Sequence, residues 1–178
     1  LVTSVFFLLI LNACNRDKTT DQNEVKSQYD IVVAQDGSGD FKTVQEAVNS
    51  LSYYNKDRVY VFIKSGIYKE VLEMNNSNIA FIGEDKENVV LTFDNYASKI
   101  NPETGTEYGT SGSSSNYLLG NDFYAENITF QNTAGPVGQA LAVYLKGDKS
   151  VFVNCNFIGN QDTWYGDRVR LYFEDCYF

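Results

Sequence analysis

Two short segments carry the polar side chains best suited to chemistry. The first contains Gln139, and the second contains Gln161 and Asp162, followed by Trp164 and Tyr165. If the segments lie side by side, two amide groups can stabilise a developing oxyanion while a carboxyl group transfers a proton. This combination suits acyl transfer to water, and the aromatic faces suit sugar rings. The alternative is structural: the glutamines belong to polar turns, Asp162 caps a turn, and the aromatic side chains pack within the fold.

The residue types that the sequence lacks exclude several kinds of catalytic and metal-binding site. The printed sequence has no histidine, which excludes a Ser-His-Asp triad, a Cys-His pair and the usual zinc sites within it. The glycines between Asp36 and Asp40 lack the spacing and the lysine of a phosphate-binding loop. We therefore expect carboxylates to carry the acid–base chemistry, without a metal.

The net charge of −9 indicates which classes of molecule the protein can bind. Nucleic acids are bound by clustered lysine and arginine, and the sequence has no such cluster, so we expect no nucleic-acid partner. An acidic protein would repel a polyanion, whereas a neutral polysaccharide would not be repelled.

The composition predicts one globular domain built from strands. The chain has 178 residues, of which 43% are hydrophobic and 15% aromatic, with 13 glycines and two prolines. Strand-forming residues separated by glycine, asparagine and aspartate turns favour an all-β architecture.

One helix is expected near the start of the folded region. The order Thr43, Val44, Gln45, Glu46 is a capping-box pattern, and the apolar residues that follow recur with helical spacing up to Leu51. The pattern predicts a helix over Thr43–Leu51, placed to cap the open first coil of the strands.

The remaining pattern is a loose repeat. The segments Asn127–Phe130, Asn154–Phe157 and Asp175–Phe178 share an Asn/Asp-x-x-Phe order, and their phenylalanines are 27 and then 21 residues apart. Such self-similarity is typical of a solenoid, in which each coil buries its apolar residues against the next, although short strands with turns also make β-sandwiches. The expected strands are Tyr29–Ala34, Val59–Lys64, Ile79–Ile82, Val89–Phe93, Tyr117–Leu119, Phe123–Phe130, Ala140–Leu145, Val151–Phe157 and Val169–Phe178.

Cys155 and Cys176 occupy the same position of neighbouring repeats. A solenoid would bring the two side chains together, so a disulfide is one expectation and a pair of stacked, reduced core cysteines is the other.

The beginning of the chain has the character of a processing signal. Residues 1–11 are mostly apolar but too short to span a bilayer, and Leu11-Asn12-Ala13-Cys14 resembles the lipobox of bacterial lipoproteins. We expect a signal segment over 1–14 with Cys14 lipidated, a tether over 15–28, and an exported protein anchored to the membrane by lipid. Because the first residue is Leu and no basic region precedes the apolar run, we also expect residues upstream. The alternative is a buried strand with an incidental cysteine.

Several long motifs resemble one family. The chain is similar to the pectinesterases over about Tyr29 to Phe178, in the segments Asp36–Ala47, Ile63–Glu70, Asn127–Pro136, Gln139–Ala140 and Gly159–Tyr165, with Arg170 and Cys176 at the expected spacing. The resemblance implies a right-handed parallel β-helix, a pectin-lyase-like solenoid, that hydrolyses methyl esters of galacturonate in pectin and releases methanol without a metal or cofactor.

The resemblance also implies roles for individual residues. Gln139 and Gln161 match the oxyanion-stabilising glutamines, Asp162 matches the general acid/base, and Trp164 and Tyr165 are expected along the sugar cleft. The family's nucleophilic aspartate lies in a Gly-x-Val-Asp-Phe-Ile-Phe-Gly-like segment that the printed sequence lacks. We therefore expect residues 29–178 to be the N-terminal portion of a catalytic β-helix, inactive by itself and monomeric, with pectin as its partner.

Two other functions fit the same architecture. A pectate lyase would need a calcium-binding carboxylate cluster and a basic residue for β-elimination. A non-catalytic pectin-binding surface protein would need only the sugar-binding face.

Overall fold

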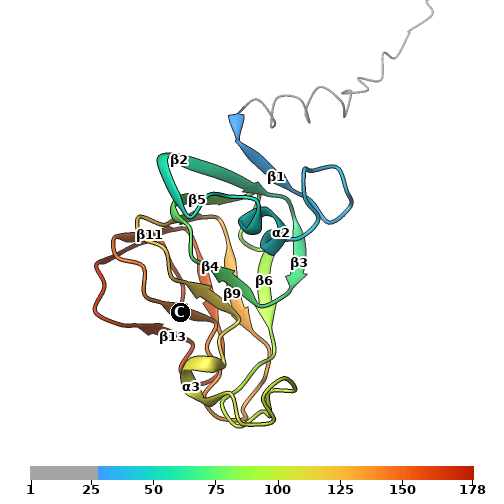
Figure 1. Ribbon diagram of the computed structural model, residues 1–178, viewed down its shortest axis with the longest axis vertical. Helices are drawn as coiled ribbons and strands as arrows, with labels where there is room; N and C mark the ends of the chain where they lie inside the picture. Colours follow the sequence, from blue (N-terminus) through green and yellow to red (C-terminus); the bar gives the residue numbers. More distant parts are fainter. Residues whose placement is uncertain (1–27) are drawn as a thin grey trace, which may run out of the picture.

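The computed structural model describes residues 28–178, which form a parallel β-helix of three sheets (Figure 1). The chain runs repeatedly through sheet A, then sheet B, then sheet C, and neighbouring coils pair in parallel in each sheet. Sheet A has the order β1-β2-β5-β8-β11-β14, sheet B the order β12-β9-β6-β3, and sheet C the order β13-β10-β7-β4. The expected all-β solenoid is confirmed.

The strands are short because each coil must turn three times. In sheet A they are β1 Ile31–Val33, β2 Tyr54–Ile63, β5 Ser77–Gly83, β8 Tyr124–Glu126, β11 Ser150–Val153 and β14 Leu171–Glu174. In sheet B they are β3 Gly66–Lys69, β6 Val89–Phe93, β9 Thr129–Asn132 and β12 Asn156–Ile158. In sheet C they are β4 Leu72–Met74, β7 Asn116–Leu118, β10 Val143–Leu145 and β13 Trp164–Gly166.

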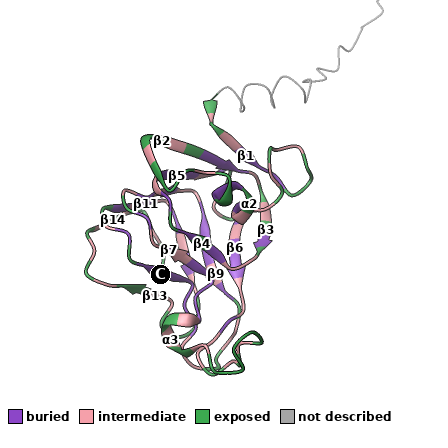
Figure 2. Cartoon of the chain, in the orientation of Figure 1, coloured by how far each residue is buried: buried purple, intermediate pink, exposed green. Residues whose placement is uncertain are grey.

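The core is the space enclosed by the three sheets, whose strands carry many of the buried residues (purple in Figure 2). Equivalent side chains of successive coils stack there. Phe130 lies opposite Phe157 in the register of sheet B, and their rings stack with centroids 5.6 Å apart. Phe157 stacks in turn on Phe178 at 4.8 Å. The repeated phenylalanines of the sequence therefore form one stacked column, in which Phe130 and Phe157 are buried in the core and Phe178 is exposed, as a solenoid requires and a sandwich does not.

The bend from sheet A to sheet B differs from the prediction. Phe123–Phe130 and Val151–Phe157 were each expected to form one strand, but each is divided into two strands by an asparagine with positive φ, Asn127 at 58° and Asn154 at 49°. Asparagine tolerates this left-handed conformation better than most residues, and a single such residue redirects the chain. Asn154 Nδ2 donates to Asn127 Oδ1 at 2.7 Å, which ties the bends of adjacent coils together.

The bend from sheet C to sheet A depends on close backbone approach. A Cβ atom placed on Gly147 would lie 1.8 Å from the carbonyl oxygen of Gly120 in the preceding coil. A side chain at Gly147 would therefore force the two coils apart.

The predicted helix is confirmed as α2, Val44–Asn49, with the capping box at Thr43 and Glu46. Its first two backbone N–H groups, from Val44 and Gln45, also donate to the carboxylate of Glu70 at 2.8 and 3.1 Å. Burial raises the pKa of Glu70, although these hydrogen bonds favour its charged form. The helix packs against β1 and β4 and buries Val44 and two further apolar residues at the end of the core.

Cys155 and Cys176 lie in the same register position of adjacent coils, between the pairs Val153↔Glu174 and Asn156↔Tyr177. The structure describes both as free cysteines, which is the second of the two expectations. Each Sγ instead contacts backbone carbonyl oxygens, that of Val153 in one case and that of Glu174 in the other, both at 3.3 Å.

The predicted signal segment 1–14, with Cys14, lies outside the described residues, as does all of the predicted tether 15–28 except its last residue. Within residues 28–178, no helix has the length and apolar character needed to cross a membrane.

Candidate active site

The polar residues singled out by the sequence lie where two neighbouring coils pass from sheet B to sheet C. Gln139 lies in the connection from β9 to β10, and Gln161 and Asp162 lie in the connection from β12 to β13. The backbone N–H of Ala140 donates to the carbonyl oxygen of Gln161 at 3.0 Å, and that of Ala142 donates to Thr163 at 2.9 Å. The two segments are thus stacked on each other, as the oxyanion hypothesis requires.

The backbone of Gln139 is held in place by the residue before it and by a hydrogen bond from a neighbouring segment. Gly138 directly before it has φ of 109°, which residues with a side chain rarely adopt, so the sharp entry into Gln139 depends on glycine. The carbonyl oxygen of Gln139 accepts a hydrogen bond of 2.8 Å from the N–H of Ala97. Ala97 lies in the long connection 94–115, which contains the short helix α3, Gly109–Gly112 (Figure 1).

A buried asparagine supports this segment from behind. Asn132 is only 3% exposed, and its Nδ2 donates to the carbonyl oxygens of Asn95, Ser113 and Leu141 at 2.9, 3.2 and 3.0 Å. One side chain therefore joins the segment 94–115 to the residues between Gln139 and β10. A buried polar group that is fully hydrogen-bonded in this way specifies a single arrangement of the backbone.

Asp162 has a left-handed backbone conformation, which is uncommon for a residue other than glycine. Its φ of 59° lies in the left-handed region, which aspartate, asparagine and glycine tolerate best. The residue is exposed. Within residues 28–178, the side chains of Asp162, Gln139 and Gln161 make no hydrogen bond with the protein. All three groups are accordingly available to a bound molecule.

A row of tyrosines crosses the outer face of sheet C; the sequence singled out Tyr165 but not its two partners. Tyr117, Tyr144 and Tyr165 are paired in register on three successive coils. The rings of Tyr144 and Tyr165 are stacked with centroids 5.3 Å apart, and those of Tyr117 and Tyr144 meet edge to face at 5.8 Å. The signal in the sequence was the alternation of β10, in which Tyr144 stands between buried Val143 and Leu145.

Trp164 does not lie in this row, and its expected place along the sugar cleft is corrected. Its ring packs among aromatic residues of the core, 5.3 Å from Phe152, 5.0 Å from Phe157 and 5.1 Å from Phe173 between centroids. Successive side chains of a strand point to opposite faces, so Tyr165 points outward and Trp164 inward. The structural alternative therefore holds for Trp164.

The chain is similar to known proteins of one family. The sequence profile of the pectinesterase family matches residues 30–178, nearly all of the described chain. The chain belongs to the pectinesterase family. One curated relative, putative pectinesterase/pectinesterase inhibitor 28 of Arabidopsis thaliana, is 41% identical over 157 residues, covering 86% of this chain and 20% of the relative.

Solved pectin methylesterases share the fold. The enzyme from carrot is 37% identical with a TM-score of 0.72, over 83% of this chain and 45% of the enzyme. A pectin methylesterase in complex with hexasaccharide VII is 29% identical with a TM-score of 0.76, over 83% of this chain and 48% of that protein. The chain thus spans between a fifth and a half of the length of these pectinesterases.

Arg170, which the sequence placed at a pectinesterase spacing, lies on the connection from β13 to β14. Its guanidinium and its backbone N–H both bind the carboxylate of Asp148 on the preceding coil, with Nε to Oδ1 at 3.1 Å and N to Oδ1 at 2.9 Å. These hydrogen bonds hold the pKa of Asp148 well below its usual value. The pair joins two coils of the pectinesterase solenoid beside sheet C.

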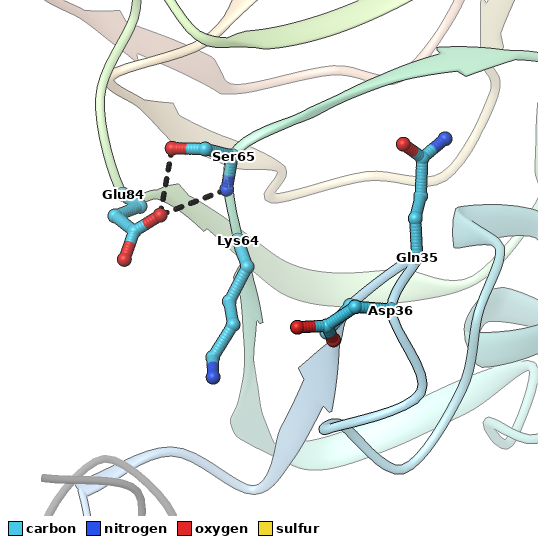
Figure 3. A pocket seen from close by; sticks show the side chains of 6 residues that line it. Gln35, Asp36, Lys64, Ser65 and Glu84 are labelled. Atoms are coloured by element: carbon cyan, nitrogen blue, oxygen red, sulfur yellow. Dashed lines mark hydrogen bonds between the residues drawn. The ribbon is translucent and has the colours of Figure 1, made fainter. Parts of the chain in front are cut away.

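A polar hollow of about 350 Å³ lies elsewhere, at the bend between β2 and β3 (Figure 3). Lys64 lies there between the carboxylates of Asp36 and Glu84, and Ser65 donates two hydrogen bonds to Glu84, at 2.9 and 2.7 Å. Lys64 Nζ also donates to Ser38 Oγ at 3.1 Å, which joins the opening segment to the first coil. The hollow is at the bend from sheet A to sheet B, whereas Gln139, Gln161 and Asp162 are at the entry to sheet C.

Proposed function

We propose that this chain is part of a pectin methylesterase that hydrolyses methyl esters of galacturonate in pectin. The observation that carries the proposal is the stacking of the Gln139 and Gln161 segments beside Asp162, at the end of an outward row of tyrosines. Aromatic faces and unpaired polar groups on one surface suit a polysaccharide with an ester to be cleaved. Membership of the pectinesterase family supports the same substrate.

In the proposed mechanism, a carboxylate attacks the ester carbonyl carbon and forms a tetrahedral oxyanion. The amide groups of Gln139 and Gln161 donate hydrogen bonds to that oxyanion, and Asp162, as the acid, protonates the methoxy oxygen as the carbon–oxygen bond breaks. Methanol leaves and an acyl-enzyme anhydride remains. The Asp162 carboxylate then takes a proton from water, which attacks the anhydride and restores both carboxyl groups.

The attacking carboxylate is the one component that we do not assign to a residue. The pectinesterase segment that carries the nucleophile has no counterpart in the printed sequence, and no aspartate of this chain is given that role. The contribution of this chain to the chemistry is thus the acid/base, the oxyanion donors and the sugar-binding face.

The product of the reaction tests the proposal. Incubation of highly methyl-esterified pectin with a protein in which this chain is joined to the nucleophile segment should release methanol without forming unsaturated uronide ends. Absorbance from an unsaturated uronide would instead indicate a lyase. Binding of pectin with neither product, in a protein that contains the nucleophile segment, would indicate a non-catalytic pectin-binding protein.

We also propose that the protein is an exported bacterial lipoprotein anchored through Cys14. The support is the order of the sequence: a short apolar run, the lipobox-like Leu11–Cys14, and then a polar stretch. A Cys14→Ser variant expressed in bacteria should lose incorporation of labelled fatty acid, whereas a Cys155→Ser variant should retain it. Equal labelling of both variants would overturn the lipid anchor.

A further inference from the structure

One polar side chain interrupts the apolar interior behind sheet C. Leu72, Asn116, Val143 and Trp164 lie opposite one another on neighbouring strands of the sheet, from β4 to β13. Asn116 begins β7 and is fully buried, whereas the other three members of this inward row are apolar or aromatic. A buried polar group is costly unless it binds a partner, so the partners of Asn116 indicate why it is there.

The amide group of Asn116 holds a backbone carbonyl of the next coil. Its Nδ2 donates to the carbonyl oxygen of Ala142 at 2.9 Å, and its backbone N–H donates to the same oxygen at 3.1 Å. A carbonyl oxygen has two lone pairs, so this oxygen is fully used and the orientation of its peptide group is fixed. The side-chain oxygen could not take the place of Nδ2, since two acceptors would then face each other.

The same peptide segment leads to the candidate active site. The backbone N–H of Ala142 donates to the carbonyl oxygen of Thr163 at 2.9 Å. Thr163 directly follows Asp162, and Ala142 follows Gln139 on its own coil. A continuous line of hydrogen bonds therefore runs from Asn116 through the coil that carries Gln139 to the coil that carries Asp162.

The oxygen of the same side chain indicates that Asn116 adds little to stability. Asn116 Oδ1 is buried and has no hydrogen-bond partner among the described residues. A buried acceptor without a donor costs at least as much free energy as one typical hydrogen bond contributes, so the two ends of the amide offset each other or leave a net cost. Leucine has the same branched shape and would occupy an apolar row without that cost. A buried polar residue of this kind calls for an explanation other than stability.

We propose that Asn116 is a positioning residue, which holds the Ala142 carbonyl so that the coils carrying Gln139 and Asp162 keep the spacing that the transition state requires. Because its side chain is fully buried, it acts through the backbone and touches neither the substrate nor the reacting atoms. A misplacement of about 1 Å in an active site can lower a rate by up to roughly 10²-fold. The inference rests on the proposed function and deepens it, because it names a buried residue on which the alignment of that site depends.

The test compares two core variants in which rate and stability should change in opposite ways. It uses a protein in which this chain is joined to the nucleophile segment. Asn116→Leu removes both the donor and the unpaired oxygen, so kcat for methanol release should fall roughly tenfold, with KM for methyl-esterified pectin within about twofold of the parent value. The midpoint of its urea unfolding should equal that of the parent or rise.

Leu72→Val is the matched control, because it alters the neighbouring position of the same row without removing a donor from the Ala142 carbonyl. Loss of buried apolar volume should lower its unfolding midpoint, while its kcat, measured well below the unfolding transition, should equal that of the parent. Equal loss of rate in the two variants, or a parent rate in Asn116→Leu, would overturn the positioning role. So would a loss of stability in Asn116→Leu large enough to account for its lost rate.

A double variant tests whether Asn116 acts through Asp162. In an Asp162→Asn background, which lacks the transferable proton, Asn116→Leu should lower the remaining rate by only about threefold or less. The same fold loss in both backgrounds would contradict an action of Asn116 through Asp162.

The exchange of backbone amides separates this inference from the proposed function. Hydrogen–deuterium exchange of the peptides that contain Ala142 and Thr163, read by mass spectrometry, should be severalfold faster in Asn116→Leu than in the parent, and this readout needs no activity. A parent protein that releases no methanol would overturn the proposed function, and the exchange rates would then decide whether Asn116 holds the two coils together. Unchanged exchange in Asn116→Leu would overturn the inference, even in a protein that proves to be an esterase.

Discussion

The carbonyl oxygen of Gln161 accepts a hydrogen bond from the backbone N–H of Ala140 at 3.0 Å, and Ala140 directly follows Gln139. The two candidate oxyanion donors are therefore held on adjacent coils by their backbones, not by their side chains. Substitution of either side chain can test its chemical role without removing the contact that aligns the coils.

The first prediction concerns Gln161→Ala. The backbone hydrogen bond to Ala140 remains, so the fold should persist, but one oxyanion donor is lost. Methanol release should fall by roughly 10²-fold in kcat with little change in pectin affinity. Gln131→Ala, on β9 in sheet B, serves as the control and should retain the parent rate. Equal rates for both variants would remove Gln161 from the mechanism.

The second prediction concerns Asn132, the buried asparagine that binds the segment after Gln139. Asn132→Ala removes the side-chain donor from the carbonyl oxygens of Asn95 and Ser113, and the acceptor from the N–H of Ala134, in a buried setting. We expect the free energy of unfolding, measured by urea denaturation, to fall by about 3 kcal/mol. Thr133→Ala removes one hydrogen bond, to Phe93, from an exposed neighbour and should cost less than about 1 kcal/mol. Similar costs for the two variants would contradict the assigned role of Asn132.

The third prediction concerns the two stacked cysteines. Burial raises the pKa of Cys155 to about 12, so its thiol is protonated near neutral pH as well as inaccessible. In a Cys14→Ser background, a maleimide should label Cys176 in the native state and Cys155 only after unfolding, as read by peptide mass spectrometry. A Cys155–Cys176 disulfide in the purified protein, or equal labelling of both, would contradict this assignment.

The fourth prediction is the pH dependence of the Asp148–Arg170 pair. The pKa of Asp148 is lowered in the folded state, so its contribution to stability is complete above the unfolded-state value and is lost as the pH falls through the folded-state value. The stability difference between the parent and Asp148→Asn should thus be largest near neutral pH and vanish in strong acid. Because the pair is largely exposed, the difference should be small and should decrease with salt. A difference that grows on acidification would contradict the assignment.

Much of the fold could be predicted because local and long-range patterns agree. The column of Phe130, Phe157 and Phe178 is visible in the sequence as a repeat, and the capping box at Thr43 marks the helix directly. The division of the long strands could not be predicted, because a single left-handed asparagine such as Asn127 makes the bend.

The candidate site could be predicted only in part. The backbone stacking of the Gln139 and Gln161 segments agrees with the prediction, since each segment follows one of the repeated segments that end at Phe130 and Phe157. The inward direction of Trp164 depends on where β13 begins, because a shift of one residue exchanges the two faces of a strand. A hollow lined by Glu73, Asn95 and Tyr117 depends on the segment 94–115, whose sequence has no periodic pattern, so the sequence could not predict it.

The central claim is that Asp162 transfers protons in a pectin methylesterase, and the rate of methanol release by Asp162→Asn tests it most directly. Asparagine tolerates the left-handed backbone of this position, so the variant should fold and bind pectin like the parent protein. It lacks an exchangeable carboxyl proton, so methanol release from methyl-esterified pectin should fall by roughly 10²-fold or more. A variant that binds pectin and releases methanol at the parent rate would contradict the assignment.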